Sequence, residues 1–365
     1  MNITFLIGNG FDRNLGLKTT YADFIKYYKN TKGATKILEK FRNYINDNEE
    51  LWRNAEIALG KYTNEFESGN GMAFSECHQD LCEHLVEYLK KEEKRLSFDS
   101  SIEKVLSAFK NIINPESPFP TQERDIIRGI FNTFKSEDYN FDFICFNYTS
   151  TLDKCLEIIK NSAGVLGQHR NGNTVHNHTI RQICHVHGTV EKEIVFAVND
   201  ETQIAKPDIF DFEDGEICKH LLIKQQANES YQENTDTKAK QILQSSTIIY
   251  IYGMSLGETD TLWWNRICTW LRGSDARHLI IQNYDMSNKG VYPLQYQLAE
   301  KRKKKEILSF SDFDSNTKTA LMKRIHITGD NIFSEISNIA NEISSTTSTI
   351  VESEKAIEQT QKKAV

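Results

Sequence analysis

Short runs of β-branched and aromatic residues, separated by longer segments with helical periodicity, limit most strongly what this chain of 365 residues can fold into. Several runs are almost continuously apolar, which is typical of strands covered on both faces. The alternation predicts an α/β fold with a mainly parallel sheet. The expected strands are ITFLIGN from Ile3, FDFICFN from Phe141, ICHVHG from Ile183, IVFAV from Ile194, TIIYIYG from Thr247, HLIIQNY from His278 and RIHITGD from Arg324.

The spacing of these strands predicts two insertions. Roughly 130 residues separate the first strand from the second, whereas a crossover between parallel strands needs only about 12. Residues 34–135 have helical periodicity and are expected to form a helical insertion, and the more polar residues 200–244 a second, smaller one. The α/β domain then comprises residues 1–33 and 136–340. Residues 345–365 have few large apolar side chains and are expected to form a loose C-terminal tail.

The composition indicates a soluble globular protein, with 39% hydrophobic and 26% charged residues. No apolar stretch approaches the roughly 20 residues of a membrane-spanning helix, and the N-terminus lacks a signal-peptide pattern. The seven cysteines contain no CxxC pair, so we expect reduced thiols in a cytoplasmic protein. The net charge of −7 gives no general attraction to nucleic acid. The basic run KRKKKE from Lys301 is interpreted as a solvated helix face.

The first expected strand ends in a turn formed by Gly8 to Gly10, followed by Phe11 and Asp12. Glycine permits a positive φ or the close approach of another backbone. A turn with free amides before a helix also accepts phosphate. The dinucleotide fingerprint GxGxxG would need a third glycine where Arg13 stands. From these residues alone, the segment is either a phosphate-binding turn or a turn without a ligand.

Other expected strands also end in polar or small residues. Asn147 and Tyr148 follow the run from Phe141, His187 ends the run from Ile183, and Gly253 follows the run from Thr247. Because ligands bind outside the carboxyl ends of parallel strands, we expect Asn147 and His187 to lie within reach of one ligand. Asn147 is alternatively a helix cap. His187 is either a general base near neutral pH or a buried histidine bound to a carbonyl.

The histidines also allow a metal site. His176 and His178, in HNH, and the segment 184–187, in CHVH, are interpreted as a possible hairpin that presents several nitrogens to one ion. Neither segment has a specific zinc spacing, so the catalytic interpretation is preferred. A metal-dependent hydrolase or nuclease would use this cluster together with acids such as Glu56 or Asp200.

Together these landmarks resemble the bacteriophage abortive infection AbiH family. The resemblance rests on IGNGFDRNLGLKTTYADF, LWRNAEIAL, FNYTSTLD, HVHG, FAVNDETQI and YGMSLGETD, which follow one another from Asn2 to about Trp264. It implies a role in anti-phage defence. Met254 stands where members of the family often carry histidine.

The same landmarks are similar, more distantly, to the sirtuin-like NAD-binding fold. That resemblance implies a Rossmann-like domain that binds NAD as its substrate and cleaves the bond between nicotinamide and ribose. It implies catalytic roles for Asn147 and His187. The cofactor-binding residues that we expect are Gly8, Asn9, Gly10, Phe11, Asp12, Tyr148, Gly253, Ser255 and Asp260. The four-cysteine zinc module of protein deacylases is missing, which argues against lysine deacylation.

Three functions therefore remain open. The first is an anti-phage effector that hydrolyses NAD to nicotinamide and ADP-ribose. The second is a nucleotide sensor or subunit of a defence complex, and the third is the metal-dependent hydrolase or nuclease. We expect NAD or a related nucleotide as the ligand, and either a homo-oligomer or a partner defence protein. Neither a membrane nor nucleic acid is expected as a partner.

Overall fold

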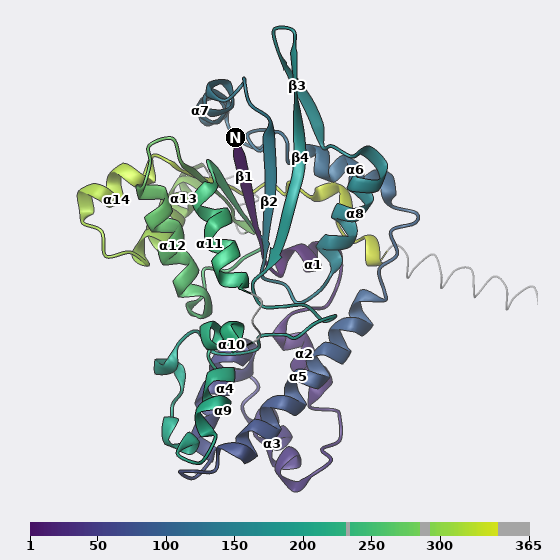
Figure 1. The fold of residues 1–365 in the computed structure, drawn as a ribbon, viewed down its shortest axis with the longest axis vertical. Helices are drawn as coiled ribbons and strands as arrows, with labels where there is room; N and C mark the ends of the chain where they lie inside the picture. The colour runs from purple at the N-terminus through teal and green to yellow at the C-terminus, as the bar shows by residue number, and fades with distance from the viewer. Residues whose placement is uncertain (231–233, 285–292, 342–365) are drawn as a thin grey trace, which may run out of the picture.

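Seven strands form a single sheet within the residues that the computed structural model describes, namely 1–230, 234–284 and 293–341 (Figure 1). The strands are β1 Asn2–Ile7, β2 Tyr139–Cys145, β3 Gly167–Asn171, β4 Thr174–His185, β5 Ile248–Tyr252, β6 His278–Gln282 and β7 Ile325–Thr328. Their order is β3-β4-β2-β1-β5-β6-β7, and every neighbouring pair is parallel except β3 and β4. The predicted α/β fold with a mainly parallel sheet is confirmed.

The chain builds this sheet outward from its centre. β1 pairs with β2 on one side and with β5 on the other. After β1 the chain adds β2 and β4 in one direction, then returns to the centre and adds β5, β6 and β7 in the other. Counted in chain order, the mutually parallel strands of the described residues are arranged 3-2-1-4-5-6. The direction of strand addition therefore reverses between β1 and β5.

Helices account for most of the other described elements. They are α1 Gly10–Asn14, α2 Tyr21–Tyr28, α3 Lys36–Asp47, α4 Ala55–Tyr62, α5 Gly71–Glu93, α6 Ile102–Asn111, α7 Thr121–Thr133, α8 Thr151–Ala163, α9 Gly215–Leu221, α10 Lys224–Ser230, α11 Thr235–Ser245, α12 Thr261–Arg272, α13 Pro293–Ser309 and α14 Ser315–Met322. Short 3-10 turns are η1 Leu51–Asn54, η2 Thr63–Glu65, η3 Glu201–Gln203, η4 Pro207–Phe210, η5 Glu258–Asp260 and η7 Ser334–Ile336.

Neighbouring residues of the central strands enter two different cores. Phe5 stacks on Phe143 and Tyr250, with ring centroids 5.6 and 5.1 Å apart, on the face covered by α6 and α8. Leu6 belongs to the opposite face, which α11 and α12 cover. Because both faces are covered, the strands need apolar side chains on both sides, which explains their nearly continuous apolar runs.

A second group of helices lies beyond the carboxyl ends of the strands, in the lower half of Figure 1. This lower helical layer, formed by α2, α3, α4, α5 and α9, surrounds an aromatic core in which Phe41 contacts Trp52 and Tyr62. α6 instead packs on the sheet through Phe109. Residues 34–135 thus form helices that divide between two cores. Their separation as an insertion of their own stays a prediction.

The predicted strand IVFAV, residues 194–198, is wrong. The segment makes only isolated bridges, from Gly188 to Ile194 and from Val198 to Ile223. Alternate residues of the segment pack into the core of the lower helical layer, so burial against helices rather than pairing in the sheet explains its apolar character.

The strand predicted from Ile183 is longer than expected. β4 already begins at Thr174, and its first half pairs antiparallel with β3 across a turn at Gly172, whose φ is +58°. The HNH segment therefore lies within β4 and the CHVH segment at its carboxyl end, so the predicted hairpin between them is wrong. His178 instead bonds through Nε2 to Nδ1 of His169, at 2.9 Å.

No helix in the described ranges is long and apolar enough to cross a membrane. The basic run from Lys301 lies in α13. The predicted loose tail, residues 345–365, falls outside the described residues.

Candidate ligand-binding site at the carboxyl edge of the sheet

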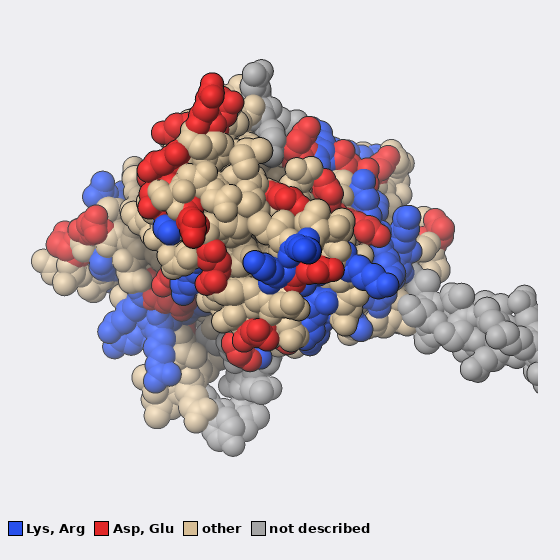
Figure 2. Space-filling model, turned by 90° about the horizontal axis from the view of Figure 1, so that it is seen from below, with Lys and Arg blue, Asp and Glu red and all other residues tan. Residues whose placement is uncertain are grey.

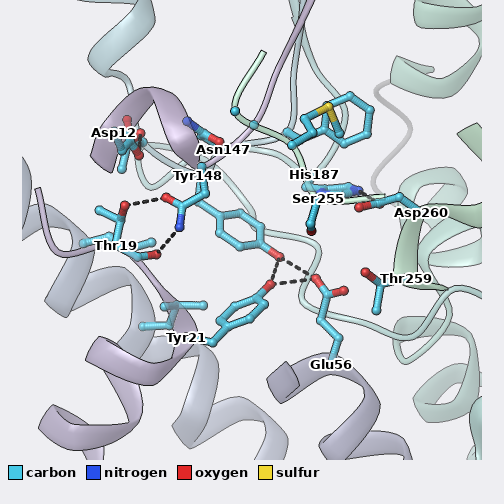
Figure 3. A pocket seen from close by; sticks show the side chains of 18 residues that line it. Asp12, Thr19, Tyr21, Glu56, Asn147, Tyr148, His187, Ser255, Thr259 and Asp260 are labelled. Atoms are coloured by element: carbon cyan, nitrogen blue, oxygen red, sulfur yellow. Dashed lines mark hydrogen bonds and ion pairs between the residues drawn. The ribbon is translucent and has the colours of Figure 1, made fainter. Parts of the chain in front are cut away.

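The loops that follow β1 and β5 leave the sheet where strand addition reverses. Ligands of open α/β sheets bind at such a point, in the crevice outside the carboxyl ends of the strands. A pocket of about 190 Å³ lies here, between the sheet and the lower helical layer (Figure 3). This volume is more than ten times the roughly 10–15 Å³ that one water molecule needs. The pocket therefore has room for a ring-sized group.

Nine of the predicted site residues line this pocket. They are Gly8, Asn9, Asp12, Asn147, Tyr148, His187, Gly253, Ser255 and Asp260. The predicted pair Asn147 and His187 thus shares one cavity. Gly10 and Phe11 do not line it. The side chain of Phe11 lies in the core, where its ring packs edge-on against that of Phe333 with centroids 5.2 Å apart.

The glycines after β1 are needed because the turn crosses the turn after β5 at very short range. A Cβ atom on Gly10 would lie 2.4 Å from Cα of Gly253, and one on Gly8 would lie 2.7 Å from the Gly253 carbonyl oxygen. The amides of Gly8 and Gly10 donate to the carbonyls of Tyr252 and Gly253, and the amide of Phe11 to that of Gly8. These three amides are engaged within the protein. Backbone packing therefore explains the two glycines, and these three amides are not available to a phosphate.

The side chain of Asn147 is buried without a hydrogen-bond partner. The residue is only 6% exposed, and neither Nδ2 nor Oδ1 has a partner in good hydrogen-bond geometry, although the amide lies close enough to the carboxylate of Asp12 to lower the pKa of that group. Asn147 is not the cap of α8, whose N-cap is Ser150. Leaving a buried amide unpaired costs about 1–3 kcal/mol. A free donor next to a free acceptor is suited to bind a hydroxyl group or a water molecule.

Asp12 is a buried carboxylate held by two threonines. Oγ1 of Thr149 donates to Oδ2 at 2.7 Å, and Oγ1 of Thr151 donates to Oδ1 at 2.5 Å. Burial raises the pKa of Asp12 to about 6, the two hydrogen bonds oppose the rise, and the nearby Glu93 carboxylate adds to it. A carboxyl group with a pKa near neutrality is well tuned to accept a proton.

Replacing Asp12 by asparagine is expected to remove a pH dependence of stability. Because the folded-state pKa of about 6 lies above the ordinary 3.8, the contribution of Asp12 to stability is fully present below pH 3.8, and about 3 kcal/mol of it is lost as the pH rises through 6. Roughly half of this loss falls between pH 5 and 8. Urea unfolding across that pH range should show that the free energy of unfolding falls with rising pH in the wild type but not in Asp12→Asn. The control Asp47→Asn, at an exposed position, should behave like the wild type, and parallel curves for all three would contradict the assignment.

The carboxylate of Glu56 lies across the pocket from Asp12 (Figure 3) and binds side chains from two other helices. The hydroxyl of Tyr21, in α2, donates to Oε1 at 2.7 Å, and Nζ of Lys224, in α10, binds Oε2 at 3.0 Å. The hydroxyl of Tyr148 lies 3.4 Å from Oε1. Nζ of Lys224 also lies 3.2 Å from Oδ1 of Asp260. Lys224, which lies in the predicted second insertion, thus supplies a positively charged group to the side of the pocket that Glu56 and Asp260 form.

His187 is held as a neutral imidazole. Its Nε2 lies 3.7 Å from Oδ1 of Asp260, but burial, and after it the ammonium of Lys224, lowers the pKa of His187 to about 3. A general base is efficient when its pKa lies near the working pH, so the predicted role of His187 as a base near neutrality does not fit this arrangement. His185, two residues earlier in the CHVH segment, binds Asp153 of α8 through Nε2 at 2.9 Å.

Several residues of the site were not among the predicted ones. Those that line the pocket are Thr19, Tyr21, Glu56, Leu85, Leu89, Phe146, Thr149, Met254 and Thr259. The sequence pattern points to Glu56 only as part of a metal site, and it gives no indication of Lys224. Tyr21 and Glu56 come from the lower helical layer, whose packing against the strand ends no local pattern reveals. Both residues lie in segments on which the AbiH resemblance rests, and this resemblance is the sequence feature that could have identified them as site residues.

The fold and the site define an α/β protein with a candidate ligand pocket, lined by both polar and apolar residues, at the carboxyl ends of parallel strands. The family model for bacteriophage abortive infection AbiH matches residues 4–282. The chain therefore belongs to the AbiH family, which supports a role in abortive infection by bacteriophage. The matched range contains every residue that lines the pocket. No curated protein matches the chain.

Proposed function

We propose that the pocket binds NAD as a substrate and hydrolyses the bond between nicotinamide and ribose, so that the protein acts in abortive infection by depleting NAD. The strand order 3-2-1-4-5-6 supports this proposal. It is the order of Rossmann-like dinucleotide-binding domains, in which the ligand lies across the point where strand addition reverses. The pocket occupies that point. The distant resemblance of the sequence to the sirtuin-like NAD-binding fold supports the same proposal.

The observation that carries the proposal is the unpartnered amide of Asn147 beside Asp12. Cleavage of a glycosidic bond passes through an oxocarbenium-like transition state. Such a reaction depends more on holding the sugar and a water molecule in place than on a strong nucleophile. The free donor and free acceptor of the amide suit a ribose hydroxyl or the attacking water. Holding the reactants in the reactive geometry lowers the barrier substantially.

The proton released in this reaction is assigned to Asp12. The oxygen of water forms a bond to C1 of the ribose, and the bond from C1 to the nicotinamide nitrogen breaks with its electron pair on that nitrogen. One proton of the water passes to the Asp12 carboxylate, whose pKa burial raises to about 6. General acid–base catalysis of this kind contributes roughly 10²–10⁴-fold. His187, as a neutral ring, positions a ligand by one hydrogen bond instead of removing the proton.

The two alternative functions differ in how much support they have. A nucleotide sensor would use the same pocket without cleavage. A metal-dependent nuclease has less support, because no group of three or more His, Cys, Asp or Glu side chains within the described ranges is placed to hold a metal ion. On the face shown in Figure 2, basic side chains are interspersed with acidic ones and do not form a continuous track for nucleic acid.

Measuring NAD in infected cells tests the proposal. We expect cells that carry the wild-type protein to lose most of their NAD after infection. Asn147→Ala is expected to slow this loss at least about 10²-fold, because the reacting groups lose their orientation. His187→Ala is expected to slow it as well. Asn173→Ala, at an exposed position in the turn between β3 and β4, is the matched control and should behave like the wild type.

Constant NAD in cells that the wild-type protein protects would contradict hydrolysis and favour the sensor. Equal NAD loss with Asn147→Ala and Asn173→Ala would contradict the assigned site.

A further inference from the structure

Carboxylic acids line the pocket, and strongly basic side chains do not. Among the lining residues, Asp12, Glu56 and Asp260 are carboxylic acids, and none is lysine or arginine. Asp12 and Glu56 are 1% and 3% exposed, so water screens their charges poorly. The pocket therefore presents a negative potential to a ligand.

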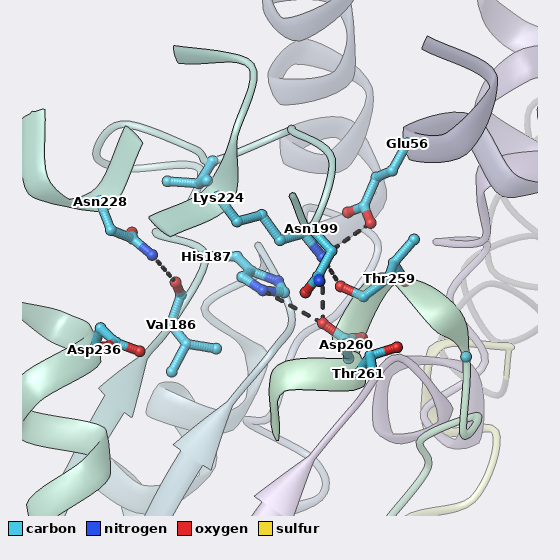
Figure 4. Close-up of polar contacts among 12 residues, drawn as sticks. Glu56, Val186, His187, Asn199, Lys224, Asn228, Asp236, Thr259, Asp260 and Thr261 are labelled. Atoms are coloured by element: carbon cyan, nitrogen blue, oxygen red, sulfur yellow. Dashed lines mark hydrogen bonds and ion pairs between the residues drawn. The ribbon is translucent and has the colours of Figure 1, made fainter. Parts of the chain in front are cut away.

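Glu56 and Asp260 form the acidic wall of the pocket. Lys224 contacts both of them, and all donors of its ammonium group are engaged (Figure 4). Nζ lies 3.0 Å from Oε2 of Glu56, 3.2 Å from Oδ1 of Asp260 and 3.0 Å from the carbonyl oxygen of Thr259. An ammonium group has three donors, so none remains for a ligand. The carboxylates of Glu56 and Asp260 share the single positive charge of Lys224. Because the nearby His187 is neutral, the acidic wall keeps an excess of negative charge.

Burial makes this excess of negative charge unfavourable. Burial raises the pKa of Glu56, and the Lys224 ammonium opposes that rise. A second cation in the pocket would act in the same direction as Lys224 and favour the ionised carboxylate. The hydroxyl of Tyr21 and the ammonium of Lys224 each fix one oxygen of Glu56, so the carboxylate is already oriented. The acidic wall therefore favours a ligand group that carries a positive charge.

A second observation points to a ligand in the same cavity. The Asn147 amide is 6% exposed, lines the pocket and lacks a partner for both its donor and its acceptor. A ligand that joins a cationic ring to a sugar fits both features. Its hydroxyl groups would form hydrogen bonds with the Asn147 amide, and its ring would be attracted to the acidic wall.

We propose that Glu56 makes the pocket select the oxidised form of NAD, whose nicotinamide ring is positively charged, over the reduced form, whose ring is neutral. This inference rests on the proposed function. Glu56 is the specificity-determining residue, and Lys224 is a positioning residue that holds it. Nicotinamide leaves as a neutral molecule after cleavage, so the product loses the attraction that favoured the substrate.

Calorimetric titration of the full chain tests this selectivity with three probes. The first is the carbocyclic analogue of oxidised NAD, in which a methylene group replaces the ring oxygen of the nicotinamide ribose, so that the bond resists cleavage. The second is its reduced form, and the third is ADP-ribose, which lacks the ring. We expect the wild type to bind the oxidised analogue at least about 10-fold more tightly than the reduced one, because opposite charges a few ångströms apart attract strongly in a poorly screened site.

Glu56→Gln has nearly the same shape and removes the charge. It is expected to weaken binding of the oxidised analogue about 10-fold and to change the reduced analogue and ADP-ribose less than about twofold. Glu116→Gln is the matched control, since Glu116 is also buried and pairs with Arg128 at 3.4 Å outside the pocket. It should leave all three affinities unchanged. Asp260→Asn is a second charge-removing variant in case Glu56→Gln does not fold.

Each outcome decides the inference. Selective loss of the oxidised analogue supports it. Equal binding of the oxidised and reduced analogues to the wild type, or equal weakening of all three probes in the variants, overturns the selectivity and leaves the proposed function standing. A wild type that binds none of the probes overturns both.

Discussion

Replacing Lys224 by methionine is expected to lower the free energy of unfolding by about 3–5 kcal/mol. The residue is 8% exposed, and its ammonium is shared by Glu56 and Asp260. Methionine has a similar length but no charge, so it would leave two carboxylates facing each other without their cation. The penalty for a buried charge that has lost its partner is far larger than the net gain from an intact pair. Urea unfolding of the wild type and the variant measures the difference.

The matched control is Lys29→Met, since Lys29 pairs with Glu49 at 2.7 Å on the surface. Exposed pairs contribute about 0–1 kcal/mol, so this variant should change stability little. Combining Lys224→Met with Glu56→Gln should restore part of the loss, because one of the two charges is then removed. The loss should also be larger at pH 8 than at pH 5. Burial raises the pKa of Glu56, and without Lys224 its protonated form stabilises the fold at low pH and is lost as the pH rises. A loss below about 1 kcal/mol would contradict a buried ionic network.

Replacing Gly253 by alanine is expected to lower the free energy of unfolding by about 2–5 kcal/mol. Its φ of +67° is strained for any residue with a Cβ atom, and that atom would lie 2.7 Å from Cα of Gly10 and 2.8 Å from the amide nitrogen of Phe11. The first effect contributes about 1–2 kcal/mol and the overpacking about 1–3 kcal/mol. Both obstructing atoms belong to the backbone, so no side-chain rotation relieves the contact.

Three other glycines separate these two effects. Gly10→Ala tests the contact alone, because its Cβ would lie 2.4 Å from Cα of Gly253 without a positive φ. Gly172→Ala tests the conformation alone, because φ is +58° and a Cβ would meet nothing within 4 Å. Gly129→Ala, inside α7 with open space around it, is expected to stabilise the protein by about 0.5–1 kcal/mol. Equal losses for Gly253→Ala and Gly172→Ala in urea unfolding would show that the two turns separate easily.

Much of the sheet was predictable from the sequence, because buried parallel strands need nearly continuous apolar runs. The runs from Ile3, Phe141, Thr247, His278 and Arg324 are strands for this reason. The run at 194–198 has the same composition but packs against helices, and a short apolar run alone does not distinguish the two environments. β3 was missed because GQHRN is polar, and it pairs only as an edge strand in a hairpin with β4.

The placement of the site was also predictable in part. Parallel strands end at one edge of a sheet, so the polar residues that follow them meet there, and Asn147 and His187 do share a pocket. The sequence likewise marked Gly8 and Gly253 as special turn positions. The sequence does not show why glycine is needed at these positions, because each glycine makes room for the backbone of the other turn, which is far away along the chain.

The α/β class and the edge at which polar residues gather can be inferred from the sequence, because both follow from local apolar patterns and from the direction of the strands. The chemistry of that edge depends on the folded arrangement. It brings Glu56 from the lower helical layer and Lys224 from α10 into one buried network, and it lowers the pKa of His187 while raising that of Asp12. A pKa depends on burial and on charges that approach through space, and neither is set by neighbouring residues in the chain.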